Sequence, residues 1–282
     1  MPESTVIVDT HAHVWPLMAD PAELAVATVS PRSEVSIQLL DLYLEEYGVQ
    51  RAVLVQTMFA REDNSYVADS AAARPDRYAA VCVVDPARAD AADQLEYWVV
   101  TRGCRGLRLR PRFRVEEACF GSPETFALWD KAEQLGVVVN VLAGPEHLPT
   151  IAMLARRFAG VPIALDHMAH PDPCSLVAGG DAWRDLRNLA QYPNVFVKIS
   201  GQGYFSHQPY PHADCQPLVQ DLLQHFGPRQ LLWGSDFPHV LLKIGYGRAL
   251  RLVQSQCAGL EPAALDRILG GNALDLYWGR KR

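Results

Sequence analysis

The stretch IVDTHAHVWP at residues 7–16 begins as an apolar strand and runs directly into two histidines. Successive side chains of a strand point to opposite faces, so His11 and His13 share one face, together with Asp9. Two imidazoles on one face can bind a single ion or hydrogen-bond a single substrate oxygen. Two polar residues that merely end a strand are the alternative, so the pair has to be judged by its surroundings.

A short β-branched run followed by a segment of helical period recurs along the chain. Eight such runs are present, with apolar cores at residues 6–8, 52–55, 79–84, 104–109, 137–142, 162–165, 194–199 and 230–233. Near-continuous apolar strands are typical of a parallel sheet that helices cover. Amphipathic segments at 36–48, 122–136 and 180–193 lie between them, and the second has Ser122 as its N-cap and stops at Gly136.

This alternation predicts the fold class α/β, as a (β/α)8 TIM barrel that spans residues 1–282 as a single domain. A doubly wound open sheet is the alternative. It would normally carry a Gly-rich phosphate turn after its first strand, and HAHVWP is not such a turn. The longest irregular stretch, residues 200–214, follows the seventh strand, where barrels place function.

Polar residues stand at two other strand ends. The sixth strand ends in IALDHMAHP, which puts His167 at its exit, and the eighth ends in LLWGSDFPH, which puts Asp236 just past the apolar run. The first and eighth strands of a closed barrel are neighbours, so we expect both residues to converge with the two histidines of the first strand. Three imidazoles and one carboxylate can hold a divalent ion with a water. Without a metal, they can bind a carbonyl oxygen while the aspartate takes a proton from water.

Substrate-binding candidates lie on the fourth and seventh strands. Arg108 and Arg110 share one face of their strand while leucines occupy the other, so the arginines are predicted to point inward as a fork for a substrate carboxylate. The alternative is that they pair with internal acids such as Asp9, or that Arg110 turns to solvent. Lys198, in the apolar run VFVKIS, is expected in the lumen, paired with an acid or a substrate anion.

Two further residues are candidates for the pocket wall. Met58 stands at the exit of the second strand, and Tyr204 stands on the long segment after the seventh strand. For Tyr204 the alternative is a solvated position in a loop.

The motifs VDTHAHVWP, LDHMAHP, VKISG, LLWGSDFPH and GGNALDLYW resemble the amidohydrolase superfamily. The most similar branch is the amidohydrolase-2 type, which includes 2-pyrone-4,6-dicarboxylate lactonase and related sugar and muconolactone lactonases. The resemblance spans nearly the whole chain. It implies a distorted (β/α)8 barrel that hydrolyses an ester or amide, with Asp236 activating water. It also assigns His11, His13 and His167 to the histidine positions of the site.

The chain departs from the binuclear members of that superfamily. Those members carry a lysine at the end of strand four and a histidine at the end of strand five, where this chain has Arg108-Leu109-Arg110 and Asn140-Val141-Leu142. His147 comes too late and is expected in the next helix. The resemblance therefore implies one divalent ion, zinc or manganese, or a metal-free mechanism. The ligands of a single ion would be His11, His13, His167 and Asp236.

The predicted reaction is the opening of a cyclic ester, a lactone, that bears a carboxylate. A metal-dependent decarboxylase of an aromatic or unsaturated acid is the first alternative. Such members of the superfamily generally carry the fifth-strand histidine that is missing here. A barrel that binds a ligand without catalysis is the second alternative, and it is hard to reconcile with four polar residues at one mouth.

The composition of the chain limits the kinds of partner that it is expected to bind. The formal charge is −6 with no block of lysine or arginine, which argues against nucleic acid or an anionic membrane surface. No apolar run reaches the roughly 18 residues of a membrane span, and the first residues lack the features of a signal peptide. The six cysteines form no CxxC pair. We therefore expect a cytoplasmic enzyme with a small-molecule substrate, and a homodimer as the commonest oligomer.

Overall fold

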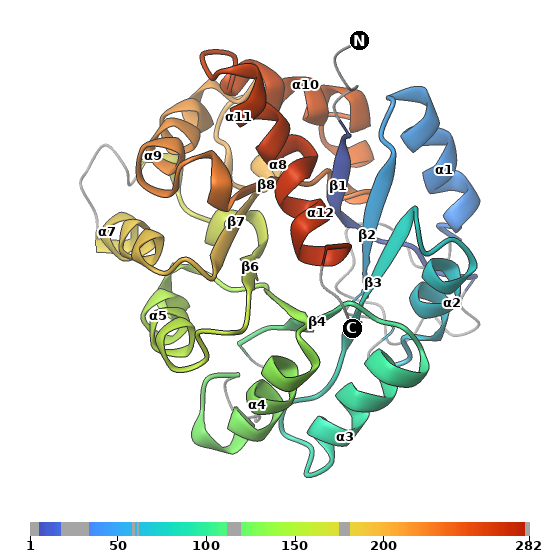
Figure 1. Cartoon of the computed structure of the whole chain (residues 1–282). Helices are drawn as coiled ribbons and strands as arrows, with labels where there is room; N and C mark the ends of the chain where they lie inside the picture. The colour runs from blue at the N-terminus through green and yellow to red at the C-terminus, as the bar shows by residue number, and fades with distance from the viewer. Residues whose placement is uncertain are drawn as a thin grey trace.

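The computed structural model describes residues 6–17, 34–57, 60, 62–111, 120–174 and 181–279. Eight parallel strands follow one another in the order of the chain, each hydrogen-bonded to the next (Figure 1). This order confirms the predicted TIM barrel and excludes the doubly wound sheet, in which the strand order reverses. The strands are β1 (Val8–Ala12), β2 (Arg51–Val55), β3 (Tyr78–Val83), β4 (Gly106–Leu109), β5 (Val138–Val141), β6 (Ile163–Leu165), β7 (Val195–Ile199) and β8 (Leu231–Trp233).

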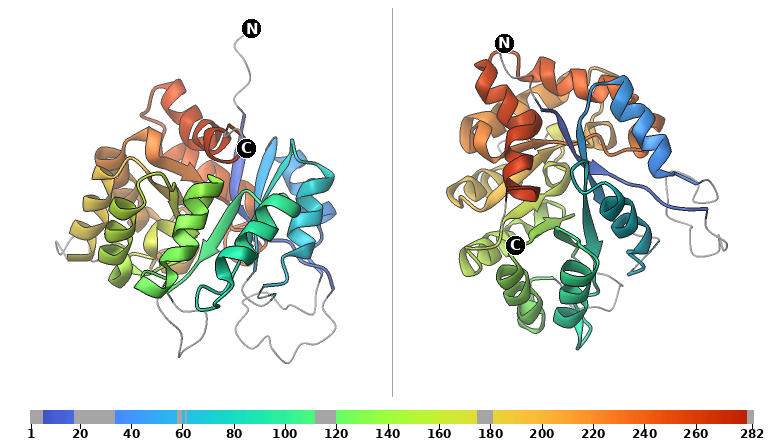
Figure 2. Two further views of the ribbon diagram at one scale, coloured as in Figure 1. Left: turned by 60° about the horizontal axis from the view of Figure 1, so that its bottom comes forward. Right: turned by 45° about the vertical axis from the view of Figure 1, so that its right-hand side comes forward.

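Helices surround the strand ring, most of them on its outside, as Figure 2 shows from two further directions. They are α1 (Ile37–Glu46), α2 (Ser65–Ala73), α3 (Ala91–Glu96), α4 (Phe126–Leu135), α5 (Leu148–Arg157), α7 (Asp181–Asn188), α8 (Gln202–Phe205), α9 (Gln216–Phe226), α10 (Tyr246–Gln256), α11 (Pro262–Asp266) and α12 (Asn272–Tyr277). The stop signal in the sequence holds: α4 ends at Gly136 in the left-handed conformation, with φ 64°. His147 ends a 3₁₀ turn that leads into α5, as expected.

The segment 200–214 is more ordered than the sequence suggested. It contains α8 directly after β7, and a 3₁₀ turn, Ala213–Cys215, begins at its end. The description of this segment as one irregular stretch was therefore wrong for Gln202–Phe205, whereas the residues between α8 and the 3₁₀ turn are irregular as expected. A short helix here matters because it places Tyr204 at a fixed position above the barrel rim.

The core has an inner and an outer layer. Inside the barrel, small and β-branched strand residues pack against α12, which lies in front of the strand ring in Figure 1. The inner layer closes the N-terminal end of the barrel, so the opening lies at the carboxyl ends of the strands. It consists of Val8, Val53, Val55, Ala79, Val81, Val138, Ala164, Leu232, Ala273, Leu276 and Tyr277. No helix among the described residues is long and apolar enough to cross a membrane.

A β-bulge interrupts β1, because its register with β2 shifts between Asp9 and Ala12. The bulge turns Asp9 away from the lumen. Outside the lumen its carboxylate accepts hydrogen bonds from the Ser235 amide at 2.8 Å and the Tyr246 hydroxyl at 2.9 Å. The expectation that Asp9 shares a face with the histidines was therefore wrong. An extra residue in a strand reverses which side chains point inward.

The barrel closes between β1 and the segment that follows β8. Ala12 forms a bridge with Phe237, and the Asp236 amide donates to the His11 carbonyl at 2.8 Å. Gly234 permits this approach, since a Cβ there would lie 2.9 Å from the Cβ of His11. Closure thus brings Asp236 beside the histidines of β1.

Candidate active site

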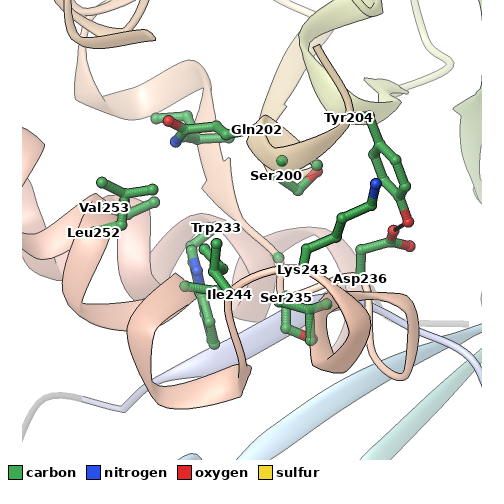
Figure 3. A pocket seen from close by; sticks show the side chains of 16 residues that line it. Ser200, Gln202, Tyr204, Trp233, Ser235, Asp236, Lys243, Ile244, Leu252 and Val253 are labelled. Carbon is green, nitrogen blue, oxygen red and sulfur yellow. Dashed lines mark hydrogen bonds between the residues drawn. The ribbon is translucent and has the colours of Figure 1, made fainter. Parts of the chain in front are cut away.

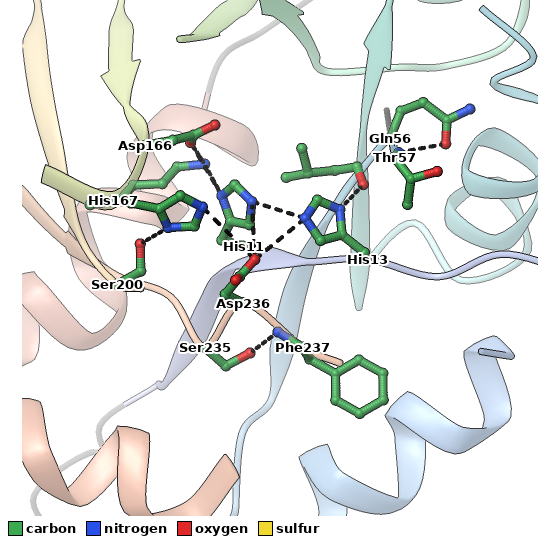
Figure 4. Close-up of polar contacts among 12 residues, drawn as sticks. His11, His13, Gln56, Thr57, Asp166, His167, Ser200, Ser235, Asp236 and Phe237 are labelled. Atoms are coloured by element: carbon green, nitrogen blue, oxygen red, sulfur yellow. Dashed lines mark hydrogen bonds and ion pairs between the residues drawn. The ribbon is translucent and has the colours of Figure 1, made fainter. Parts of the chain in front are cut away.

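The four polar residues predicted from the strand ends do converge at the mouth (Figure 4). His11 lies on β1 itself, His13 just after it, His167 in the turn after β6, and Asp236 after β8. The Oδ1 atom of Asp236 lies 3.7 Å from Nε2 of His11, 3.4 Å from that of His13 and 3.9 Å from that of His167. All four residues are at most 4% exposed.

The backbone that carries two of these residues is strained. His167 begins four consecutive residues with positive φ, between 49° and 63°, and Asp236 has φ 62°. A non-glycine residue in the left-handed region costs roughly 1 kcal/mol or more. Such strain persists only where the surrounding structure fixes the backbone, and it is concentrated at functional sites. Holding His167 and Asp236 in these positions therefore lowers the stability of the fold.

Hydrogen bonds behind the imidazoles set their orientation. Nδ1 of His13 lies 2.6 Å from the carbonyl oxygen of Val55, which can only accept, so this nitrogen carries the proton. A neutral His13 therefore presents an unprotonated Nε2 to the centre of the site. Nδ1 of His167 lies 2.9 Å from the hydroxyl of Ser200, which can donate or accept. Ser200 was not a predicted site residue, although it directly follows β7, the strand that carries Lys198.

Lys198 lies in the lumen and pairs with an acid, as predicted. Its ammonium is 2.9 Å from Asp166 Oδ1, 2.7 Å from Asn140 Oδ1 and 3.3 Å from Nδ1 of His11. Tyr277 of α12 donates to the same Asn140 oxygen at 2.8 Å. The Lys198 side chain is 0% exposed. Lys198 therefore contacts only groups of the protein interior among the described residues, and His11 is the residue that links it to the site.

Arg108 also points inward and is 5% exposed. It donates from Nε to Asp166 Oδ2 at 3.3 Å and from Nη1 to the carbonyl of Gln56 at 3.3 Å. The internal acid that pairs with it is therefore Asp166 and not Asp9, because the bulge has moved Asp9 outside the barrel. Arg110 follows β4 and is half-buried. Met58 lies outside the described residues.

Tyr204 contacts the reaction centre. Its hydroxyl donates a hydrogen bond to Oδ2 of Asp236, while 37% of the residue stays exposed. The alternative of a solvated loop residue was therefore wrong. Since one carboxylate oxygen of Asp236 faces Tyr204 and the other faces the imidazoles, the tyrosine fixes which oxygen is presented to the site.

Charge states follow from burial. Burial lowers the pKa of His167 to about 4 and holds the pKa of His11 well below its ordinary value. Burial alone would raise the pKa of Asp236, but the neighbouring imidazoles of His167, His13 and His11 outweigh it and hold that pKa below its ordinary value. At neutral pH the centre therefore holds an ionised carboxylate beside neutral His11 and His167. This is the state required of a base or of a metal ligand.

The residues present fit a single divalent ion. One ligand atom each of His11, His167 and Asp236 lies within 4.8 Å of the other two. His13 stands beside this group, with its Nε2 3.2 Å from Nε2 of His11. Two nitrogens on one tetrahedral zinc, each roughly 2.0–2.1 Å from the metal, would be roughly 3.3 Å apart. The donor set of neutral imidazoles and one carboxylate is the one that zinc prefers.

A small pocket adjoins Asp236 on the side of α10 (Figure 3). Tyr204 and Asp236 contribute to its wall, and the Lys243 ammonium lies 5.5 Å from the centre of the Tyr204 ring. The remaining wall is largely apolar and includes Trp233, Val240, Ile244, Leu252 and Val253. Tyr204 therefore has the Lys243 ammonium over its ring and Asp236 at its hydroxyl.

Known proteins are similar to this chain in sequence and in fold. An L-fucono-1,5-lactonase of Burkholderia ambifaria is 30% identical over 97% of this chain and 96% of its own length. A 4-sulfomuconolactone hydrolase of Rhizobium radiobacter is 28% identical over 82% of this chain and 75% of its own. A crystal structure of an amidohydrolase from Burkholderia multivorans with bound zinc superposes with a TM-score of 0.78 at 24% identity, covering 96% of this chain and 99% of that one.

The match to a family model decides the family. The model of the amidohydrolase family matches residues 8–278, from the first residue of β1 to just past α12. That range includes every strand of the barrel and all four residues at its mouth. The chain therefore belongs to the amidohydrolase family.

Proposed function

We propose that this amidohydrolase opens a lactone ring by attack of a water molecule that Asp236 activates. One observation carries the proposal: an ionised, buried carboxylate faces three imidazole nitrogens at 3.4 to 3.9 Å at the mouth of the barrel. The names of the relatives support the substrate class, since a fucono-lactonase and a sulfomuconolactone hydrolase both act on cyclic esters. We extend the proposal to a lactone that bears a carboxylate.

Each residue of the site has a separate role in the proposed reaction. Asp236 Oδ1 takes a proton from water as the water oxygen forms a bond to the carbonyl carbon, and the carbonyl oxygen gains the negative charge. When the Ser200 hydroxyl donates to Nδ1 of His167, the Nε2–H group of that imidazole stabilises this oxyanion. When the tetrahedral intermediate collapses, the ring C–O bond breaks and Asp236 returns its proton to the leaving alkoxide. Tyr204 keeps Oδ2 occupied, so Oδ1 performs both transfers.

His11, His13, His167 and Asp236 would hold a zinc or manganese ion, which when bound would polarise the substrate carbonyl as a Lewis acid. Elemental analysis of protein purified without chelator measures how many metal ions each chain binds. We expect at most one equivalent of metal per chain, because the strand-four lysine and strand-five histidine of binuclear members are absent. Two equivalents in the barrel would contradict the proposed site.

A substrate panel tests the reaction. The protein is incubated with sugar-acid lactones, muconolactones and pyrone dicarboxylates, and separately with aromatic acids. Ring opening at neutral pH releases one proton per lactone and is followed with a pH indicator, whereas decarboxylation is followed as CO2. We expect proton release on at least one lactone. CO2 release without proton release would favour a decarboxylase, and no turnover of either set would favour a binding barrel.

Gly201 offers a prediction about the position of His167. Its φ is 68°, and an added Cβ would lie 2.9 Å from Nδ1 and 3.0 Å from Cγ of that imidazole. We expect Gly201→Ala to lower the free energy of unfolding by about 2 kcal/mol and lactone turnover by about tenfold or more, because His167 must move. Chemical denaturation and steady-state kinetics measure the two effects.

Gly48→Ala is the matched control. Gly48 has nearly the same φ, 65°, but a Cβ there meets nothing within 4 Å. This variant should lose only the roughly 1 kcal/mol of left-handed backbone strain and keep full turnover. Equal losses of stability and equal turnover in the two variants would show that contact with His167 is not what constrains Gly201.

A further inference from the structure

Two buried groups with opposite requirements contact the same nitrogen of His11. Asp166 Oδ1 lies 3.2 Å from Nδ1 and can only accept a hydrogen bond, whereas the Lys198 ammonium lies 3.3 Å from Nδ1 and can only donate one. A protonated Nδ1 would donate to Asp166. An unprotonated Nδ1 would accept from Lys198. The two hydrogen bonds therefore exclude each other.

The contacts of Nε2, the other nitrogen of His11, also depend on whether that nitrogen carries the proton. Its Nε2 lies 3.2 Å from Nε2 of His13, which is unprotonated when His13 is neutral, because the proton of that ring is held by the Val55 carbonyl. With a proton on Nε2, His11 donates to His13. Without one, two lone pairs face each other at 3.2 Å, and that arrangement is favourable only around a cation.

We infer that Lys198 and Asp166 select between two tautomers of His11, one for each state of the site. In the metal-free state Lys198 donates to Nδ1, and Nε2–H of His11 donates to His13. In the ion-binding state Nδ1–H donates to Asp166 and leaves both Nε2 atoms as ligands. The ring keeps one proton in either state, and the two states differ only in the nitrogen that carries it. Lys198 and Asp166 are thus positioning residues of the proposed site.

The surroundings hold both selecting groups in place. The Lys198 ammonium is anchored by Asn140, and Asp166 is anchored by Arg108 on its second oxygen. Lys198 and Asp166 are 0% exposed, so solvent cannot replace either contact to His11. A metal must therefore compete with the hydrogen bond from Lys198, which lowers its apparent affinity by the fraction of His11 in the binding tautomer.

Lys198→Met tests the selection. The variant removes the donor to Nδ1 and leaves Asp166 as its partner, with Arg108 still compensating the carboxylate. We expect Zn²⁺ to bind about tenfold more tightly than to the parent protein. The dissociation constant is measured on chelator-stripped protein by competition with a chromophoric chelator, so no substrate is needed. Equal or weaker binding by folded Lys198→Met would overturn the inference.

Two further variants fix the sign and the origin of the effect. Asp166→Asn replaces the charged acceptor for Nδ1–H with a neutral amide, whose NH2 group can also donate to an unprotonated Nδ1, and should weaken Zn²⁺ binding by about 10- to 100-fold. Tyr277→Phe loosens the same buried network at Asn140 without a contact to His11, so its affinity should equal that of the parent protein. An increase in Tyr277→Phe equal to that in Lys198→Met would assign the effect to general loosening and contradict the selection.

The unmodified protein provides a test that needs no variant. The ¹⁵N signals of histidine rings distinguish a protonated from an unprotonated nitrogen. Metal-free protein should show His11 protonated at Nε2, and zinc-loaded protein should show it protonated at Nδ1. The same tautomer in both states would overturn the inference. Since these measurements do not involve a lactone, they stand or fall separately from the proposed reaction.

Discussion

Asp236→Asn is expected to lower kcat/KM on a hydrolysed lactone by about 10²–10⁴, the usual effect of losing a general base. The substitution keeps the size of the side chain and the acceptor for Tyr204 but removes the negative charge that faces the imidazoles at 3.4 to 3.9 Å. An amide oxygen cannot take a proton from water at neutral pH. Steady-state kinetics on the best substrate of the panel, with fluorescence-monitored unfolding as a check on the fold, measures the effect.

Tyr204→Phe is the comparison that separates the base from its orientation. It removes the hydrogen bond to Oδ2 but leaves the carboxylate and its charge. We expect a loss of about tenfold or less, well below that of Asp236→Asn. Near-normal turnover in folded Asp236→Asn would contradict the proposed mechanism. A larger loss in Tyr204→Phe than in Asp236→Asn would make the tyrosine, and not the aspartate, the group that handles the proton.

The strands and the convergence of the site were predictable because both follow from local sequence. Apolar runs bounded by helical segments give the order of a barrel, and barrel closure brings the ends of β1 and β8 together. His13, His167 and Asp236 could therefore be placed from their positions just past those runs. Their convergence follows from the barrel, but their exact distances also depend on the strained backbone at His167 and Asp236 and on the hydrogen bonds behind the imidazoles, which no local pattern shows.

The pairing of charges inside the lumen was not predictable in the same way. Lys198 meets Asn140 and Asp166 because of the stagger between β5, β6 and β7, which no local pattern encodes. Asp166 was visible beside His167 in the sequence, but nothing there indicated that it pairs with both Arg108 and Lys198. A buried lysine in an apolar strand signals a partner without identifying it.

The bulge in β1 was missed for a related reason. Strict alternation put Asp9 on the face of the histidines, and the sequence VDTHAH contains no glycine to mark an irregularity. The signal was chemical: an aspartate inside an apolar strand requires donors, and Ser235 and Tyr246 supply them from outside the lumen. The result is a structural role for Asp9, distinct from the chemistry of its neighbours.

Asp9→Ala is expected to lower the free energy of unfolding by about 3–5 kcal/mol, because it leaves several buried donors without an acceptor. The carboxylate accepts from the Ser235 amide at 2.8 Å, the Ser235 hydroxyl at 2.5 Å, the Tyr246 hydroxyl at 2.9 Å and the His11 amide at 3.1 Å. These bonds join β1 to the segment after β8 and to α10, where the barrel closes. Denaturant unfolding followed by tryptophan fluorescence measures the loss.

Asp9→Asn and Tyr246→Phe divide that loss into its parts. Burial raises the pKa of Asp9 even though its hydrogen bonds oppose the shift, so the charge itself is held there at a cost. Asparagine keeps one acceptor oxygen, and its amide can donate to a hydroxyl, so we expect it to lose less than half as much stability as alanine. Tyr246→Phe removes one of the four bonds and should cost about 1 kcal/mol. A loss in Asp9→Asn as large as that in Asp9→Ala would show that the negative charge, and not the number of acceptors, holds β1 against β8.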